Sequence, residues 1–313
     1  MARAFVFPGQ GSQAVGMGKE LAGAFASARE VFQEVDDALS QRLSALMFEG
    51  PESDLTLTEN AQPALMAMSL AVLRVLAKDG GKDLTSMCSY VAGHSLGEYS
   101  ALCAAGSIGL ADAARLLKRR GQAMQKAVPV GIGAMAALLG ATPAQAAEVA
   151  KDAAQGEVCD VANDNSEGQV VISGNRTAIE RAIEIAKTKG IRKSMMLPVS
   201  APFHCALMKP AADVMAEALE RVDIKPPVVP VVANVTAQPV DTPATIKRLL
   251  IEQIPNLVRW RESVLELKKR GVTTLVECGA GKVLAQMTKR IDKDLAAVSV
   301  GAPADIDAFL KTL

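Results

Sequence analysis

Hydrophobic positions along the 313-residue chain fall into two alternating patterns. Short apolar runs, such as Met87–Ala92, predict buried strands, because a strand covered on both faces needs no polar alternation. Longer segments carry apolar residues every three or four positions, which predicts a helix with one buried face. One such stripe contains Leu110, Ala113, Leu117, Gly121, Met124 and Val128. Strands that alternate with helices in this way predict an α/β protein with a parallel sheet.

The first and last parts of the chain share this alternation. Before residue 129 it predicts a strand at Ala4–Phe7, a helix with one face formed by Ala28, Val31, Phe32, Val35 and Leu39, and helices at Ala61–Lys78, Glu98–Ala105 and Ala111–Val128. We expect Asn60 to cap the helix that starts at 61, with Pro63 in its first turn. After residue 200 the pattern predicts strands at Val228–Asn234, Thr273–Glu277 and Ala296–Val300, and helices at Pro243–Ile254, Trp260–Arg270, Lys282–Lys289 and Ala304–Leu313.

Between these parts the order of elements changes. Strand, helix, strand, strand, helix and strand are expected at Gly133–Leu139, Thr142–Ala154, Val158–Ala162, Gln169–Ser173, Thr177–Lys189 and Ile191–Val199. Thr142 is the expected helix N-cap, and residues 163–168 are expected to form a polar turn. This order is that of a ferredoxin-like unit. We therefore expect a large α/β-hydrolase-like domain at 1–128 and 200–313, with 129–199 inserted as a ferredoxin-like subdomain.

Composition narrows the functional classes. The 34 Lys and Arg residues are balanced by 34 Asp and Glu, so the chain lacks the basic excess of a nucleic-acid-binding surface. The longest apolar runs end before the ~18 residues of a membrane span, and no signal-like apolar segment follows a charged start. The five cysteines, at 88, 103, 159, 205 and 278, form no C-x-x-C pair. We expect reduced thiols in a cytoplasmic protein with no membrane or nucleic-acid partner.

Candidate chemistry centres on Gly93-His94-Ser95-Leu96-Gly97, a match to the G-x-S-x-G nucleophile elbow between a strand and a helix. Glycines on both sides suit a turn in which the backbone is strained and crowded. The Ser95 hydroxyl would be exposed beside a helix N-terminus, whose free N–H groups can stabilise an oxyanion. The alternative is a Gly-rich strand–helix loop with an incidental serine.

Two other glycine-rich stretches resemble nucleotide-binding motifs only in part. The segment Pro8–Gln13 with Ala14 fits the spacing of a dinucleotide fingerprint, but no acidic residue ends a second strand about 20 residues later. We interpret it as a turn near the active face. The stretch Gly279–Lys282 lacks both the spacing and the Ser or Thr of a P-loop, and a tight turn between strand and helix is expected there.

Two further side chains are candidates for the same site. In the basic run at 118–120, Arg120 lies against the apolar stripe, whereas Lys118 and Arg119 point toward solvent. Arg120 is either an inward binding residue or part of a solvated charged face. The chain has only two histidines, and His94 cannot readily turn back onto the adjacent serine. His204 is therefore the candidate general base, with a lone structural histidine as the alternative.

In sequence order, the motifs resemble those of the malonyl-CoA:acyl-carrier-protein transacylases of the bacterial dissociated fatty-acid synthase, over essentially the whole chain. Together they are far more specific than the elbow alone. The matching motifs are Pro8-Gly9-Gln10-Gly11-Ser12-Gln13, Gly93-His94-Ser95-Leu96-Gly97, Lys118-Arg119-Arg120-Gly121, Phe203-His204-Cys205-Ala206-Leu207-Met208, Asn234-Val235 and Gly279-Ala280-Gly281-Lys282-Val283-Leu284.

The resemblance implies roles for the matched residues. Ser95 would be the nucleophile and His204 its base, oriented by the main-chain carbonyl of Gln253 rather than by a carboxylate. The backbone N–H groups of Gln10 and Leu96 would form the oxyanion hole. The family also has an insertion domain, which corresponds to the ferredoxin-like unit expected above.

On the substrate side, the resemblance implies that Arg120 holds the malonyl carboxylate. We also assign Met124 and Phe203 to the substrate pocket. At Phe203 the sequence departs from stand-alone bacterial relatives, which often carry a small residue there. In polyketide acyltransferases, a Phe before this histidine accompanies malonyl over methylmalonyl.

The implied reaction is a ping-pong transfer of malonyl from malonyl-CoA to the phosphopantetheine thiol of acyl carrier protein, which supplies fatty-acid elongation. No cofactor or metal is implied, because the coenzyme A thioester is a substrate, and a monomer is expected. Two other functions compete. A serine hydrolase uses the same elbow with water as acceptor. A catalytically silent docking protein for acyl carrier protein is the second, although the intact Ser95 and His204 argue against it.

Overall fold

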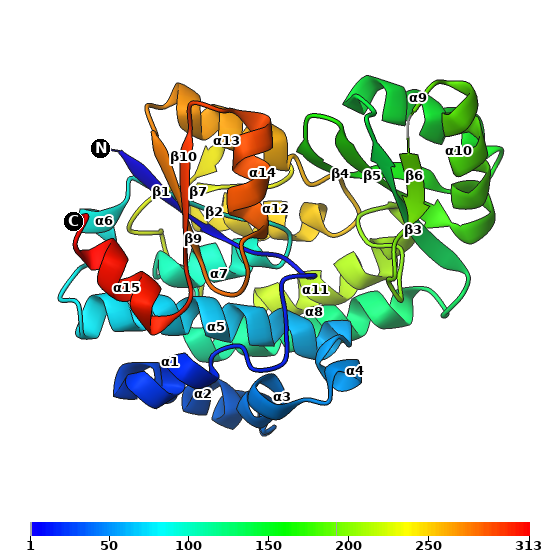
Figure 1. Cartoon of the computed structure of the whole chain (residues 1–313). Helices are drawn as coiled ribbons and strands as arrows, with labels where there is room; N and C mark the ends of the chain where they lie inside the picture. The colour runs from blue at the N-terminus through cyan, green and yellow to red at the C-terminus, as the bar shows by residue number, and fades with distance from the viewer. Residues whose placement is uncertain (1, 192) are drawn as a thin grey trace.

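The computed structural model describes residues 2–191 and 193–313. They form two β-sheets in separate lobes, joined below by long helices (Figure 1). The larger sheet has the spatial order β10 (Ala296–Val300), β9 (Thr274–Cys278), β1 (Arg3–Phe7), β2 (Tyr90–Gly93), β7 (Val231–Val232) and β8 (Pro239–Val240). The smaller sheet has the order β4 (Cys159–Ser166), β5 (Gln169–Asn175), β3 (Gly133–Leu139) and β6 (Lys193–Met196).

Helices cover both sheets. Those before the smaller lobe are α1 (Lys19–Ala24), α2 (Ala26–Leu39), α3 (Leu43–Glu49), α4 (Glu52–Leu55), α5 (Thr58–Lys78), α6 (Leu84–Met87), α7 (Gly97–Ala104) and α8 (Leu110–Ala127). The smaller lobe carries α9 (Pro143–Ala154) and α10 (Arg176–Thr188). The chain continues with a 3-10 turn at Ala206–Met208 and with α11 (Lys209–Glu220), α12 (Pro243–Gln253), α13 (Trp260–Lys269), α14 (Val283–Ile291) and α15 (Pro303–Leu310).

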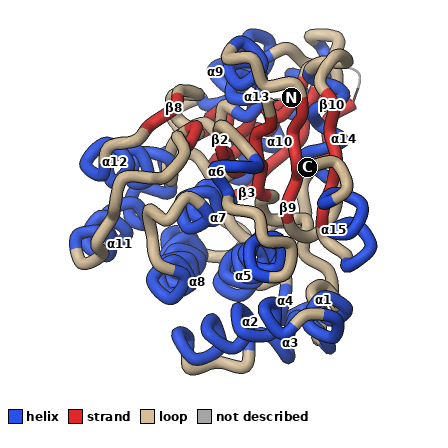
Figure 2. The backbone as a smooth tube through the Cα atoms, turned by 90° about the vertical axis from the view of Figure 1, so that its left-hand side faces the viewer, coloured by secondary structure: helices blue, strands red, loops and turns tan. Residues whose placement is uncertain are grey.

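The larger sheet is buried on both faces. Along β1, Phe5 and Phe7 face a core shared with α5, α7 and α8, while Ala4 and Val6 face a second core shared with α13 and α14. Successive strand side chains point to opposite faces, so an apolar run can serve both cores. In the view of Figure 2, α1–α3 form a further layer beneath α5 and α8. The strand that leads to Ser95, β2, lies in the middle of this sheet.

The expected parallel sheet is confirmed with one correction. Neighbouring strands from β10 to β7 run parallel, but the edge strand β8 pairs antiparallel with β7. Strand β8 was not predicted, because two residues offer no periodicity, and β7 is shorter, at Val231–Val232, than the predicted strand. Helix α11 was also not predicted, although it has an apolar face with Ala211, Ala212 and Met215.

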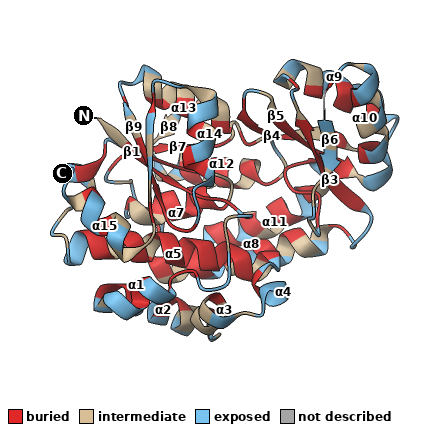
Figure 3. Ribbon diagram, in the orientation of Figure 1, coloured by how far each residue is buried: buried red, intermediate tan, exposed pale blue. Residues whose placement is uncertain are grey.

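Helix α5 is the central helix beneath the larger sheet, and its start differs from the prediction. It begins at Thr58, so Asn60 lies inside the helix and Pro63 lies beyond its first turn. The Asn60 side chain instead donates to the carbonyl of Asp54 (2.9 Å). Among the described helices, α5 has the length and hydropathy of a membrane span, contrary to our expectation of shorter apolar runs, but 83% of that segment is buried inside the protein (Figure 3).

In the smaller lobe the main correction concerns residues 163–166. They continue strand β4 and are buried, and only Glu167-Gly168 form the turn to β5. Two of these side chains bind the larger lobe: Asp164 accepts a two-pronged interaction from Arg261 (Nε–Oδ1 3.0 Å, Nη2–Oδ2 2.8 Å), and Asn165 pairs with His94. Local composition suggested a turn, but partners distant in sequence bind these two polar side chains.

The two faces of the smaller sheet have different neighbours. In β3, Ala134, Ala136 and Leu138 pack against α9 and α10, while Met135 and Ala137 belong to the core shared with the larger lobe. Thr142 caps α9 as expected, with Gln145 completing a capping box. Strand β6 is shorter than the expected Ile191–Val199, and residue 192 of that prediction lies outside the described residues.

Candidate active site

Ser95 occupies the sharp turn between β2 and α7. Its φ of 53° lies in the left-handed region, which is uncommon for a residue with a side chain. A Cβ at Gly93 would overlap the main-chain oxygen of Gly97, and a Cβ at Gly97 would overlap the carbonyl of Phe7. The glycines of the motif are therefore needed for packing, and the strand–turn–helix geometry is that of the expected elbow.

Asn234 braces this turn from the end of the neighbouring strand. Its Oδ1 accepts a hydrogen bond from the backbone N–H of Ser95 (2.7 Å), and its Nδ2 donates to the carbonyl of Gly93 (2.7 Å). The side chain thus satisfies two backbone groups on either side of His94, in a fully buried position. Asn234 belongs to one of the motifs that carry the family resemblance, but no role was predicted for it.

His204 comes from a loop far along the chain and meets the serine directly. Its Nε2 lies 2.7 Å from Ser95 Oγ, and its Nδ1 lies 3.0 Å from the main-chain oxygen of Gln253. A carbonyl can only accept, so Nδ1 carries the proton and Nε2 is free to accept from the hydroxyl. The backbone of His204 also has a positive φ, 58°. No Asp or Glu in the described chain makes a hydrogen bond to this imidazole.

His204 is held in its neutral form. Burial and the nearby positive charge of Arg120 lower the pKa of His204 to about 3, against the weaker opposing effect of the bond to Gln253. A neutral imidazole is the state that can take a proton from the serine hydroxyl. A negatively charged group that arrives beside Arg120 would offset part of this lowering.

Arg120 lies inside the protein, with 1% of its surface exposed. Nη1 donates to Gln62 Oε1 (2.8 Å), and Nη2 donates to Gln253 Oε1 (2.8 Å). Nη2 also lies 3.2 Å from Ser95 Oγ. Within residues 2–191 and 193–313, no carboxylate oxygen approaches this guanidinium to within 4.0 Å. Its Cζ lies over the ring of Tyr99, 5.7 Å from the centroid.

The other two residues of the basic run behave differently. Arg119 is exposed, as expected. Lys118 is only partly exposed, because it reaches back to α5, where it donates to Asn60 Oδ1 (2.9 Å) and pairs with Glu59 (3.0 Å). The prediction that Lys118 points to solvent was wrong for this reason.

Gln10 and Leu96 both line the pocket of the serine. In the described part of the molecule, neither backbone N–H donates to a protein acceptor. Two free donors beside a nucleophile are what an oxyanion hole requires. The Gln10 side chain accepts from Thr58 Oγ1 (2.8 Å), which in turn accepts from Gln62 (3.0 Å).

A cavity of about 450 Å³ opens above Ser95 between the two lobes. The larger lobe contributes Met124 and Arg120, and Phe203 enters from the loop that carries His204. Apolar side chains of the smaller lobe close the opposite wall, namely Met135, Val171, Leu197 and Val199. The cavity therefore combines one buried cation with largely apolar walls, a setting for a small acid on a longer organic carrier.

Two other reactive side chains near the site, His94 and Cys205, are engaged in hydrogen bonds away from Ser95. His94 does not contact Ser95 Oγ, as expected, and its Nε2 lies 2.8 Å from Asn165 Oδ1 in the smaller lobe. Cys205 is buried and its thiol donates to the carbonyl of Pro202 (3.1 Å). Burial raises the pKa of Cys205 to about 11, so its thiolate is scarce at neutral pH.

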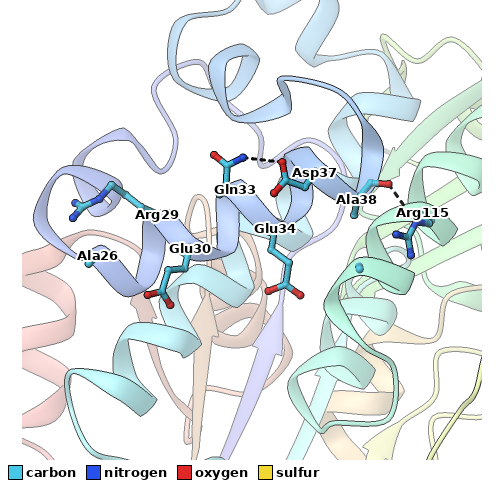
Figure 4. A pocket seen from close by; sticks show the side chains of 9 residues that line it. Ala26, Arg29, Glu30, Gln33, Glu34, Asp37, Ala38 and Arg115 are labelled. Carbon is cyan, nitrogen blue, oxygen red and sulfur yellow. Dashed lines mark hydrogen bonds between the residues drawn. The ribbon is translucent and has the colours of Figure 1, made fainter.

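A second hollow in the described structure lacks the side chains of a catalytic site. A larger open hollow of about 760 Å³ lies between α2 and α8, and Figure 4 shows its charged rim. There Gln33 donates to Asp37, and Arg115 donates to the carbonyl of Ala38. No nucleophile or histidine lines it. Among the described residues, no group of three or more His, Cys, Asp and Glu side chains could hold a metal ion.

Comparison with known proteins agrees with this geometry. Residues 4–305 match the family model described as an acyl transferase domain. The chain is 46% identical over 311 residues to the malonyl CoA-acyl carrier protein transacylase of Bacillus subtilis, covering 99% of this chain and 96% of that protein. The chain therefore belongs to the acyl transferase family, and within it resembles the malonyl transacylases.

Solved structures extend the comparison to three dimensions. The acyl-carrier-protein-S-malonyltransferase of Bartonella henselae superposes with a TM-score of 0.97, at 52% identity, over 100% of this chain and 99% of that chain. A malonyl-transacylase in complex with its type II PKS acyl-carrier protein superposes with a TM-score of 0.96, at 44% identity, over 100% of both chains. The resemblance drawn from the sequence motifs is thereby confirmed.

Proposed function

We propose that this enzyme transfers malonyl from malonyl-CoA to the phosphopantetheine thiol of acyl carrier protein, through a malonyl ester on Ser95. The observation that carries the proposal is the position of one oxygen. Ser95 Oγ lies 2.7 Å from a neutral imidazole nitrogen and 3.2 Å from a buried guanidinium nitrogen. The imidazole activates the oxygen, and the guanidinium selects an acyl group that ends in a carboxylate.

In the first half-reaction, the Ser95 hydroxyl gives its proton to Nε2 of His204 while Oγ attacks the thioester carbonyl of malonyl-CoA. The carbonyl oxygen becomes negative and accepts hydrogen bonds from the N–H groups of Gln10 and Leu96. The carbon–sulfur bond then breaks, and the sulfur leaves with the proton from His204. The products are malonyl-Ser95 and free coenzyme A.

The second half-reaction reverses these roles. The carrier-protein thiol gives its proton to His204 and attacks the malonyl ester carbonyl, with the same two N–H groups on the oxygen. The bond from the carbonyl carbon to Ser95 Oγ breaks, and His204 returns the proton to that oxygen. Throughout, the carbonyl of Gln253 keeps the imidazole in the tautomer that the exchange needs.

Arg120 selects the substrate in this proposal. A guanidinium binds a carboxylate with two parallel hydrogen bonds, and in this protein Gln62 and Gln253 hold it beside the reacting oxygen. Malonyl places its free carboxylate one methylene beyond the reacting carbonyl, which suits a cation adjacent to Oγ. Phe203 and Met124 line the remaining space and limit substituents on that methylene.

We propose the finer fold description on the same basis. The order strand, helix, strand, strand, helix, strand and the arrangement β4-β5-β3-β6 support a ferredoxin-like insertion at 129–199. The strand–turn–helix at Ser95 supports a hydrolase-like domain at 1–128 and 200–313. The reaction needs neither metal nor cofactor, and we propose a monomer in the cytoplasm, where the five unpaired cysteines would stay reduced.

Turnover with and without a thiol acceptor tests the function. Malonyl-CoA is supplied to the enzyme with acyl carrier protein that bears phosphopantetheine, with the same carrier protein lacking it, or with buffer alone. We expect release of coenzyme A beyond one equivalent per enzyme only with the phosphopantetheine-bearing carrier, matched by malonyl on that carrier. Equal continued release in all three reactions would identify a hydrolase, and no release in any of them would identify a docking protein.

A further inference from the structure

Glu98 is a buried carboxylate that the proposed mechanism does not use. It lies in the first turn of α7, three residues after Ser95, with 2% of its surface exposed. Acidic side chains are rarely buried to this extent unless they are paired. Its Oε2 accepts from the backbone N–H of Asn234 (3.0 Å) and from Nε2 of Gln253 (2.8 Å). Both partners also contact the Ser95 turn.

The amide group of Gln253 has only one satisfactory orientation. Its Nε2 faces three acceptors: the carbonyl of Ser95 (2.9 Å), Glu98 Oε2 (2.8 Å) and, at longer range, Asn234 Oδ1 (3.3 Å). If the amide were flipped, its oxygen would face all three, and the nitrogen would face a cation. The observed orientation therefore presents Oε1 to Arg120 Nη2, 2.8 Å away.

We infer that Glu98 is a positioning residue for substrate selection. By binding the Gln253 amide nitrogen, it fixes the amide oxygen that holds the Arg120 guanidinium beside the reacting serine. The inference rests on the proposed function, because it assigns the selection of a carboxylate-bearing acyl group to Arg120.

The charges around Arg120 support an indirect action of Glu98 through Gln253. Arg120 has no direct carboxylate partner in the described structure, and two neutral amide oxygens hold it instead. Glu98 supplies a carboxylate one side chain away, on the far side of Gln253. Burial raises the pKa of Glu98 to about 7, while the hydrogen bonds from Asn234 and Gln253 and the charge of Arg120 act in the opposite direction. Because no carboxylate of the described chain binds Arg120 directly, its guanidinium is available to the carboxylate of the substrate.

The first test replaces Glu98 with two residues of similar size. Glu98→Met removes the acceptor, and Glu98→Gln keeps an oxygen that can accept from Gln253. Single-turnover acylation is measured with malonyl-CoA and acetyl-CoA, and the ratio of the two kcat/KM values is compared with the wild type. We expect Glu98→Met to lower the malonyl-to-acetyl ratio at least tenfold and Glu98→Gln to keep it within about threefold. Equal losses for both thioesters in Glu98→Met would make Glu98 merely structural.

A second variant keeps the test valid if Glu98→Met does not fold. Gln253→Met removes the amide through which Glu98 acts, while the main-chain carbonyl that binds His204 remains. Because Nη2 of Arg120 loses its acceptor in this variant, we expect the malonyl-to-acetyl ratio to fall at least tenfold. A wild-type ratio in Gln253→Met would overturn the inference.

Arg120→Ala in the same assay separates this inference from the proposed function. If Arg120→Ala loses the malonyl preference while Glu98→Met keeps it, selection by Arg120 stands and the role of Glu98 is wrong. If Arg120→Ala keeps the preference, both are wrong.

Discussion

Nη2 of Arg120 lies 3.2 Å from Oγ of Ser95, so the buried cation of this site adjoins its candidate nucleophile. Two consequences follow from this closeness. An acyl group attached to Oγ extends directly toward a partner for a terminal carboxylate. The same charge also opposes protonation of His204, whose Nε2 lies 2.7 Å from the same oxygen. Each consequence can be measured separately.

Removal of the guanidinium should change substrate preference more than catalysis. A hydrogen bond to a charged group is worth about 1.5–3 kcal/mol, or roughly 10- to 150-fold in rate. We therefore expect Arg120→Ala to lower kcat/KM for malonyl-CoA by that factor, while acetyl-CoA transfer holds or rises. Arg120→Lys is the matched control, because it keeps the charge without the planar fork, and it should recover only part of the loss. A common fall for both thioesters would make Arg120 structural.

The pH dependence of acylation should report the environment of His204. As a base it must be neutral, and burial together with Arg120 lowers its pKa to about 3. The acid limb of kcat/KM for acetyl-CoA should therefore lie well below the 6.5 of an ordinary histidine. Arg120→Ala removes one of the causes and leaves burial, the largest, so the limb should move to higher pH and still stay below 6.5. A limb at 6.5 in both proteins would contradict this environment.

Loss of the imidazole should slow both half-reactions. We expect His204→Ala to reduce acylation by roughly 10²- to 10⁴-fold, the usual range for a general base. Because the Nδ1 partner is the carbonyl of Gln253, no acidic side chain completes the pair in the part of the chain that the structure describes. Single Asp→Asn and Glu→Gln variants should therefore retain most of the activity. One such change that costs about 10⁴-fold, as loss of a triad carboxylate does, would show that a side-chain acid orients the base.

The elbow glycines should be far less tolerant than other glycines. Gly93→Ala places a Cβ against the main-chain oxygen of Gly97, and overpacking of this kind costs about 1–3 kcal/mol or more. We expect lower thermal stability together with loss of acylation. Gly23→Ala is the matched control, because Gly23 lies in helix α1 with open space around it, and there alanine should be neutral or slightly stabilising. Equal behaviour of the two variants would rule out a packing constraint at the elbow.

Hydrophobic periodicity predicted the local elements well, because the burial of a helix face or of an apolar strand depends on residues that are close together in the sequence. The helices at 110–127 and 260–269 and the strand Ala296–Val300 were placed within a residue or so. The inward position of Arg120 followed from its place on the apolar stripe, and the structure confirms it. The pairing of Ser95 with His204 could be proposed because only two histidines occur.

Features that depend on distant partners were not predictable in the same way. Asn163, Asp164 and Asn165 suggested a turn, but they continue a strand. Val258 bonds to the backbone of Ala162 and Asp164, Arg261 binds the Asp164 carboxylate, and His94 pairs with Asn165. These partners lie about 70–100 residues away in the sequence, where no local pattern shows them.

The amide and acid network behind the serine was missed for the same reason. Glu98, Asn234 and Gln253 come from three different elements and meet only in the folded chain. No role was predicted for any of these three side chains. For Gln253 only the main-chain carbonyl had a predicted role, and that prediction came from the family resemblance.

Intact-protein mass spectrometry after brief exposure to malonyl-CoA tests the central claim most directly. The wild type should gain the mass of one malonyl group, and subsequent addition of phosphopantetheine-bearing carrier protein should remove it. Ser95→Ala should gain nothing, while Cys205→Ala should label like the wild type, because that thiol is buried and bonded to Pro202. Malonyl that still attaches to Ser95→Ala, or that maps to any other residue, would contradict the assignment of Ser95 as the residue that carries the acyl group.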